Sequence, residues 1–203
     1  MTAVPRRFNE LPATGPYGVP PHTRVHKLLP GQFHVATADE LIATLLGSCV
    51  AACIYDPRRG VGGMNHFLLP DPGTGEQASA PTSVSNRYGV FAMESLINGL
   101  LDRGASRLQL RVKLFGGGRI LPQLSDVGRR NIEFVRRFVE MEGLPIAAED
   151  LGGDHPRKIL MQPASGRVRV KKLPALAPQT IGARETRYLE EIDAPPRGSV
   201  ELF

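Results

Sequence analysis

Two neighbouring stretches in the first half of the chain carry hydrophobic residues in patterns typical of β-strands. In residues 49–55, Val50, Ala52 and Ile54 occupy alternate positions, and both cysteines of the chain belong to the other alternate set. This period of two predicts a strand whose side chains point to opposite faces. Turn-forming residues follow at 56–60, and an apolar run resumes over 61–69. We therefore expect the two stretches to form a β-hairpin.

A helical spacing of apolar residues marks two segments farther along the chain. In the first, apolar side chains recur at three- and four-residue intervals, and Gly104 stands where a C-terminal cap is expected. The residues that set this spacing are Met93, Leu96, Ile97, Leu100 and Leu101. The second helix is predicted to begin near Ser125 or Asp126, which are both good N-cap residues. Its expected inner face consists of Ile132, Val135, Phe138 and Val139.

Strand-like stretches at 27–35, 108–115 and within 144–172 complete a mixed pattern of strands and helices. Residues 37–46 fit either a short helix or a turn that leads into a strand. Residues 71–84 are rich in Gly, Ser, Pro and Thr, which predicts a surface loop. The fold class that we predict is therefore α/β.

Proline-containing ends flank this pattern. Residues 1–23 lack apolar periodicity and predict an extended lead-in, whereas residues 173–203 combine proline with alternating charge and predict a flexible tail. The chain has 203 residues, of which 41% are hydrophobic and 22% charged, as in an ordinary globular protein. We therefore expect a single folded domain over residues 24–172.

The charge and hydropathy of the chain exclude two classes of partner. The formal net charge is +5 and the sequence pI is about 9.6. The basic residues are nevertheless spread along the chain, and no tryptophan is present to stack on bases, so we expect no nucleic-acid partner. No apolar run approaches the roughly 18 residues of a membrane-spanning helix, and the first residues lack the apolar core of a signal peptide. We expect a cytoplasmic protein without membrane insertion.

Cys49 and His66 are the candidate catalytic residues. A cysteine attacks a carbonyl carbon as its thiolate and needs a neighbouring base, which a histidine supplies. A four-residue hairpin loop would pair Asp56 with Val61. The same register pairs Ala51 with His66 and places Cys49 diagonally across from His66, about 7–8 Å away along the backbone. A change of one residue in the loop would send His66 to the opposite face.

The alternative interpretation of these two residues is purely structural. A cysteine in an apolar strand is usually a small buried hydrophobe, and a lone histidine is usually a satisfied polar residue. The catalytic interpretation is favoured by Gly47 and Ser48 directly before Cys49, since their backbone amides are available as an oxyanion hole. Cys53 shares the face of Cys49 but lies about 13 Å away, so we assign it to the core. Together with His66, the two cysteines give at most three metal ligands, and we predict neither a metal nor another cofactor.

Several motifs together resemble the CheD family, the chemoreceptor glutamine deamidases of bacterial chemotaxis. These motifs lie at residues 44–50, 56–57, 62–70, 87–89, 113–117, 128–131, 150–153 and 157–158. The resemblance covers roughly residues 24–172, and one departure is Gly118, where many relatives carry alanine. The resemblance implies a sandwich of mixed sheets with helices, related to the toxin deamidases.

The resemblance also implies the roles of individual residues and the substrate. Cys49 would be the nucleophile and His66 the base of a catalytic triad that includes an upstream threonine. Thr44 lies in the expected segment, and Thr37 is the other threonine close upstream. The implied enzyme is a protein-glutamine glutaminase, an amidohydrolase that converts glutamine side chains on methyl-accepting chemoreceptors to glutamate. A CheC-type phosphatase is an implied partner, and a non-catalytic regulatory binding partner of that phosphatase is the alternative function.

Overall fold

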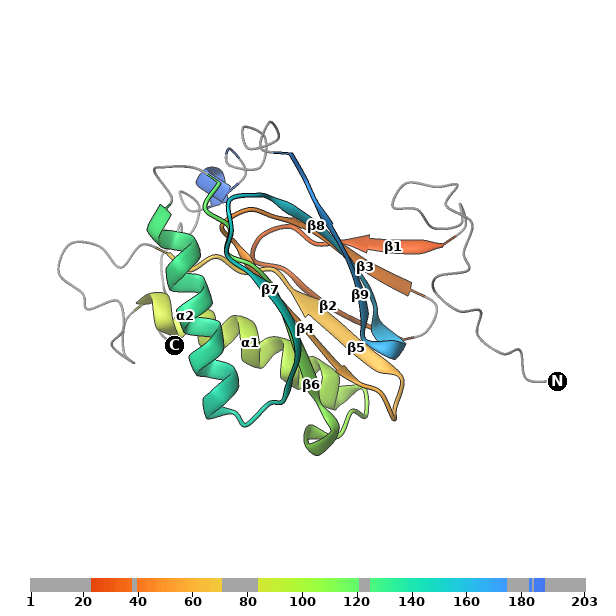
Figure 1. Ribbon diagram of the computed structural model, residues 1–203. Coiled ribbons are helices and arrows are strands. Elements are labelled where there is room, and N and C mark those ends of the chain that lie inside the picture. The colour runs from red at the N-terminus through yellow and green to blue at the C-terminus, as the bar shows by residue number, and fades with distance from the viewer. Residues whose placement is uncertain are drawn as a thin grey trace, which may run out of the picture.

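The protein is represented by a computed structural model that describes residues 23–37, 40–70, 84–120, 125–174, 183 and 185–188 (Figure 1). Its described strands form two mixed β-sheets. The four-stranded sheet has the order β1-β3-β8-β9, and only β1 and β3 run parallel within it. Its strands are β1 (Arg24–Lys27), β3 (Glu40–Leu46), β8 (Arg157–Gln162) and β9 (Arg167–Lys172).

The five-stranded sheet has the order β2-β5-β4-β6-β7, and only β6 and β7 run parallel within it. Its strands are β2 (Phe33–Ala36), β5 (Val61–Asn65), β4 (Val50–Asp56), β6 (Arg111–Gly116) and β7 (Ile146–Leu151). The helices are α1 (Val84–Asp102) and α2 (Ser125–Met141), and the short 3₁₀ turns are η2 (Arg107–Gln109) and η4 (Pro163–Ser165). The α/β class and the mixed sheets expected from the sequence are confirmed.

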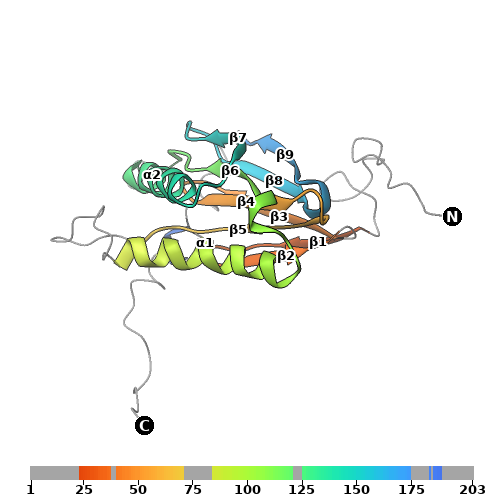
Figure 2. The same ribbon diagram turned by 90° about the horizontal axis from the view of Figure 1, so that it is seen from below.

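The five-stranded sheet lies between the helices and the four-stranded sheet. Val50, Ala52 and Ile54 of β4 lie in a buried cluster with side chains of α1 and α2, whereas Cys53 belongs to a second cluster with side chains of β3 and β8. Figure 2 shows α1 running along β2 and β5. The alternation in residues 49–55 thus separates two apolar layers, and each fully buried aliphatic side chain in them stabilises the fold by about 1.5–3 kcal/mol.

The hairpin between β4 and β5 has the register predicted from its loop. Asp56 pairs with Val61, and the carboxylate of Asp56 accepts the backbone N–H groups of the two arginines in the turn. An isolated bridge between Val50 and Phe67 continues this register beyond the end of β5. Strand β5 ends at Asn65, earlier than predicted, because the Asn65 side chain takes the place of the backbone partner of β4: its Oδ1 accepts the N–H of Ala52 at 2.8 Å.

Three further predicted elements differ from the structure or are decided by it. The stretch 27–35 is interrupted at Gly31, whose positive φ of 81° lets the chain turn between β1 and β2. Residues 40–46 form β3, so the strand alternative for 37–46 is correct. Strand β6 begins later than the predicted 108–115 because the 3₁₀ turn η2 occupies its first residues.

Both helices agree with the predicted spacing. Met93, Leu96 and Leu100 of α1 are fully buried, and Gly104 follows the helix with φ of 85°. Helix α2 begins at Ser125, as predicted. The predicted loop at 71–84 and the lead-in lie almost wholly outside the described residues. No helix among the described residues is long and apolar enough to cross a membrane.

Candidate active site

Cys49 is the last residue of a three-residue connection between the two sheets. Gly47 and Ser48 join β3 of one sheet to β4 of the other, and Cys49 directly precedes β4. The thiol is fully buried in the layer between the sheets. Because the chain changes sheets here, the backbone amides of these residues are not used in either ladder.

The three backbone N–H groups of residues 47–49 converge on one carboxylate, that of Glu185. The amides of Gly47 and Cys49 donate to its Oε1 at 3.0 and 3.1 Å. The amide and the hydroxyl of Ser48 donate to its Oε2 at 3.0 and 2.6 Å. We call these three N–H groups the amide cradle. Successive N–H groups that point the same way form a site for negatively charged oxygen.

The carbonyl groups of residues 47–49 are held on the opposite side, which fixes the direction of the amide cradle. Gly118 N–H donates to the carbonyl of residue 47 at 2.7 Å, and Gly117 N–H donates to that of residue 49 at 2.7 Å. Asn131 Nδ2 donates to the carbonyl of residue 48 at 2.9 Å. The carbonyl of residue 47 shares a peptide with the N–H of residue 48, and the carbonyl of residue 48 shares one with the N–H of residue 49. Holding these two carbonyls at the back therefore directs both N–H groups to the front.

The glycines after β6 are required by this arrangement. Gly116 has φ of 112° and Gly117 has φ of 67°, a region that favours glycine. A Cβ atom at Gly116 would lie 2.1 Å from the carbonyl oxygen of Cys49. The turn at 116–118 therefore holds the connection that carries Cys49, and its glycines allow the close approach.

His66 is held through its Nδ1 atom by Thr44. The Thr44 hydroxyl lies 2.7 Å from Nδ1 and donates its own proton to the carbonyl oxygen of Leu28 at 2.9 Å. The hydroxyl therefore accepts the proton on Nδ1, which leaves Nε2 without one. Nε2 is buried and makes no hydrogen bond with the described residues. This tautomer places the basic lone pair of the imidazole on Nε2.

Burial and the charge of Glu185 shift the pKa values of both candidate residues. Burial lowers the pKa of His66 to about 4, although the carboxylate of Glu185 acts in the opposite direction. Burial raises the pKa of the Cys49 thiol well above its usual range, and the charge of Glu185 and a hydrogen bond to its carboxylate raise it further. With Glu185 in place, the His66 imidazole is therefore neutral and the Cys49 thiol is protonated at pH 7.

Comparison with known proteins agrees with the site. A family model described as CheD chemotactic sensory transduction matches residues 68–172. A Halorhodospira halophila protein named probable chemoreceptor glutamine deamidase CheD is 52% identical over 182 residues, which are 87% of this chain and 83% of that protein. This chain belongs to the CheD family. A Hydrogenovibrio crunogenus protein that is also named probable chemoreceptor glutamine deamidase CheD is 49% identical. The match covers 88% of this chain and 93% of that protein.

Among solved structures, a Bacillus licheniformis hypothetical protein covers 63% of this CheD chain and 58% of its own, at 14% identity and a TM-score of 0.38.

The structure brings together most of the residues predicted for the CheD site. The charge of the Glu185 carboxylate acts on both Cys49 and His66, and Thr44 is hydrogen-bonded to His66. The catalytic roles of these three residues stay predictions. Thr37 is exposed and has no hydrogen bond to His66 among the described residues, which favours Thr44. Cys53 is fully buried between the sheets, and both cysteines are free. No cluster of metal-ligating side chains occurs in the described parts of the chain.

Two residues of the CheD site were not singled out from the sequence. Asn131 is a fully buried polar residue on the inner side of α2, and its Oδ1 also accepts the N–H of Leu69 at 2.9 Å. Asn131 lies within the family motif at 128–131, and this position could have marked it as a residue of the site. Glu185 is buried although it lies in the predicted tail, and no pattern around it indicates a contact with Gly47.

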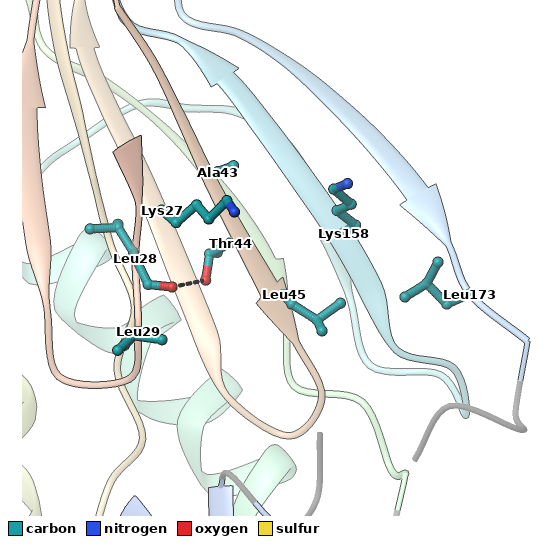
Figure 3. A pocket seen from close by; sticks show the side chains of 8 residues that line it. All are labelled: Lys27, Leu28, Leu29, Ala43, Thr44, Leu45, Lys158 and Leu173. Atoms are coloured by element: carbon teal, nitrogen blue, oxygen red, sulfur yellow. Dashed lines mark hydrogen bonds between the residues drawn. The ribbon is translucent and has the colours of Figure 1, made fainter. Parts of the chain in front are cut away.

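Thr44 also lines a cavity of about 390 Å³ (Figure 3). It is lined by Lys27, Leu28, Leu29, Ala43, Thr44, Leu45, Lys158 and Leu173. Neither Cys49 nor the residues of the amide cradle before it line this cavity. It is therefore a separate feature from the place that Glu185 occupies.

Proposed function

We propose that this protein hydrolyses the side-chain amide of glutamine residues in chemoreceptors, converting them to glutamate, with Cys49 as the nucleophile. The observation that carries the proposal is the amide cradle, which binds the carboxylate of a glutamate side chain through three N–H groups that include that of Cys49. Glutamate is the product of the proposed reaction. The names of the CheD relatives support the same substrate class.

In the first half of the proposed reaction, Nε2 of His66 takes the proton from the Cys49 thiol as the sulfur attacks the amide carbon of the substrate. The amide oxygen becomes an oxyanion, and the amide cradle stabilises it with preorganised N–H donors. When the C–N bond breaks, His66 returns the proton to the leaving nitrogen. Ammonia departs and a thioester of Cys49 remains.

In the second half, a water molecule attacks the thioester while Nε2 of His66 accepts its proton. The oxyanion forms again in the amide cradle, the C–S bond breaks, and His66 returns the proton to the Cys49 sulfur, which restores the thiol. At neutral pH the sum is one amide and one water giving one carboxylate and one ammonium ion. Thr44 keeps Nδ1 protonated in both halves and is a positioning residue.

The proposal also includes a cytoplasmic location and a second protein partner. Chemoreceptor glutamines and free cysteine thiols both suit the cytoplasm, where thiols stay reduced. A CheC-type phosphatase is proposed as a further partner on the strength of the family alone. If the chain acted only as a binding partner of that phosphatase, it would bind without releasing ammonia.

The test is incubation of the full chain with a purified receptor cytoplasmic fragment, followed by intact-mass analysis and an ammonia assay. Each hydrolysed glutamine adds about one dalton to the receptor, because an amide is replaced by an acid. The Cys49→Ala variant provides the control for contaminating activity. A receptor whose mass is the same with the wild type and with Cys49→Ala, under conditions where the chain is folded, would refute the proposal.

A further inference from the structure

Glu185 occupies the place that the proposed product would occupy. Its side chain is 2% exposed, and four donors from residues 47–49 bind its two oxygens at 2.6–3.1 Å. Both oxygens are bound, as for a carboxylate product, and one of them accepts the backbone N–H of Cys49 itself at 3.1 Å. A glutamate residue of the chain itself thus has the contacts of a deamidated glutamine.

The carboxylate also makes the site unreactive by two routes. It fills the amide cradle, so no substrate oxygen can reach those N–H groups while it is there. Its negative charge raises the pKa of the Cys49 thiol and so opposes formation of the thiolate. A neutral glutamine amide in the same place would fill the amide cradle without that charge.

Tyr188 gives the same segment a second contact with the core. Its hydroxyl contacts the hydroxyl of Tyr88 on α1. Its ring lies over Gly31, where a Cβ atom would be 1.9 Å from the tyrosine oxygen. Residues 185–188 are helical, and positions three apart share one face of a helix. Glu185 and Tyr188 therefore face the core together, whereas Thr186 and Arg187 between them are exposed.

We propose that the segment containing Glu185 and Tyr188 is an intramolecular product mimic that closes the active site, so that it has to leave before a receptor glutamine can enter. The proposal rests on the proposed function, since it takes the glutamate carboxylate as the product. It also has a chemical consequence. A glutamine placed at position 185 has the amide of a substrate beside Cys49 and is itself hydrolysed.

The hydrolysis of this glutamine breaks and forms the same bonds as the proposed hydrolysis of a receptor glutamine. In Glu185→Gln, the C–N bond of the side-chain amide breaks and ammonia leaves, a thioester with Cys49 forms, and water converts it to a carboxylate. The product is the wild-type chain. If the segment only stabilised the fold, a glutamine at position 185 would not be deamidated in a reaction that depends on Cys49.

The first experiment measures closure without any receptor, by the rate at which iodoacetamide alkylates Cys49 in the full chain. Glu185→Ala should raise this rate by about 10-fold or more, because reactivity scales with the fraction of open molecules. The buried Cys53 in the same protein should stay unmodified and reports that the fold is intact. Glu140→Gln, at an exposed position of α2, is the control and should leave the rate unchanged. Equal alkylation of Cys49 in the wild type and Glu185→Ala would overturn the proposal.

The second experiment measures mass. Purified Glu185→Gln should have the mass of the wild-type chain, whereas Cys49→Ala/Glu185→Gln should keep its amide and Glu140→Gln should keep its own. A Glu185→Gln chain that retains its amide while the wild type deamidates receptor would overturn the product mimic. Failure of the wild type and of Glu185→Ala to deamidate receptor, with Cys49 alkylation still faster in the variant, would instead contradict the proposed function and leave the closure in place.

Discussion

The Thr44 hydroxyl lies 2.7 Å from Nδ1 of His66 and donates its only proton to the Leu28 carbonyl. It can therefore serve His66 only as an acceptor. This fixes the imidazole tautomer with a bare Nε2, the form that takes a proton from a thiol. Thr44 thus controls the state of His66 although it does not touch the proposed reacting atoms.

Thr44→Val should lower kcat by about 10²-fold while changing KM little, because a misplaced imidazole loses its alignment with the thiol. Valine has the shape of threonine but cannot accept the Nδ1 proton. Thr44→Ser keeps the hydroxyl and should retain most of the activity. Steady-state deamidation of a receptor fragment by the three proteins tests this, and equal kcat for valine and threonine would remove Thr44 from the site.

Cys49→Ala should lower deamidation by about 10³-fold or more, since no other group near the amide cradle can form the thioester. Cys53→Ala is the matched control, because it deletes the same sulfur from the same buried layer at a position away from the amide cradle. We expect it to stay active. Intact-mass analysis of the receptor provides the measurement, and activity in Cys49→Ala or its loss in folded Cys53→Ala would contradict the assignment.

The hairpin, and the register that places His66 on the same face as Cys49, were predictable because both depend on local features. The turn residues at 56–60 fix the loop length, and the strict alternation of side chains then fixes which residues share a face. The early end of β5 was not predictable, because the Asn65 side chain replaces a backbone partner and this changes no apolar pattern.

The contacts that complete the site depend on residues far apart in the sequence. Glu185 is 138 positions from Gly47, and Asn131 is 83 positions from Ser48. Neither spacing has a period that a sequence pattern could reveal. The choice between Thr44 and Thr37 likewise needed the distance to His66, since both residues precede Cys49 by a plausible interval.

The buried His66 should make the protein less stable in mild acid. Its pKa is about 4 in the folded chain and about 6.5 when unfolded, so the unfolded chain binds the proton first as the pH falls. The stabilisation from keeping this imidazole neutral is complete above pH 6.5 and is lost as the pH falls towards 4. Between pH 7 and pH 5 we expect the free energy of unfolding to fall by about 2 kcal/mol from this group alone.

Urea unfolding of the wild type and of His66→Gln at several pH values checks this effect. Glutamine keeps a polar side chain but does not titrate, so the difference between the two curves isolates the histidine. We expect the wild type to lose more stability than the variant as the pH falls from 7 to 5. Parallel curves would show that the imidazole titrates normally in the folded chain.

Asn131→Asp should impair turnover because it reverses the hydrogen bond that orients the amide cradle. The Nδ2 donor to the Ser48 carbonyl becomes a carboxylate oxygen, which repels that carbonyl, while the acceptor for Leu69 N–H is kept. The peptide between Ser48 and Cys49 then loses the contact that points the Cys49 N–H group towards the oxyanion. Removing one such donor typically lowers kcat by about 10²–10³-fold.

Asn98→Asp, at an exposed position of α1, makes the same chemical change and should be neutral. Because the buried charge also destabilises the fold, kcat is measured at a temperature where circular dichroism shows the variant folded. Wild-type kcat in folded Asn131→Asp would show that the amide cradle keeps its direction without this contact.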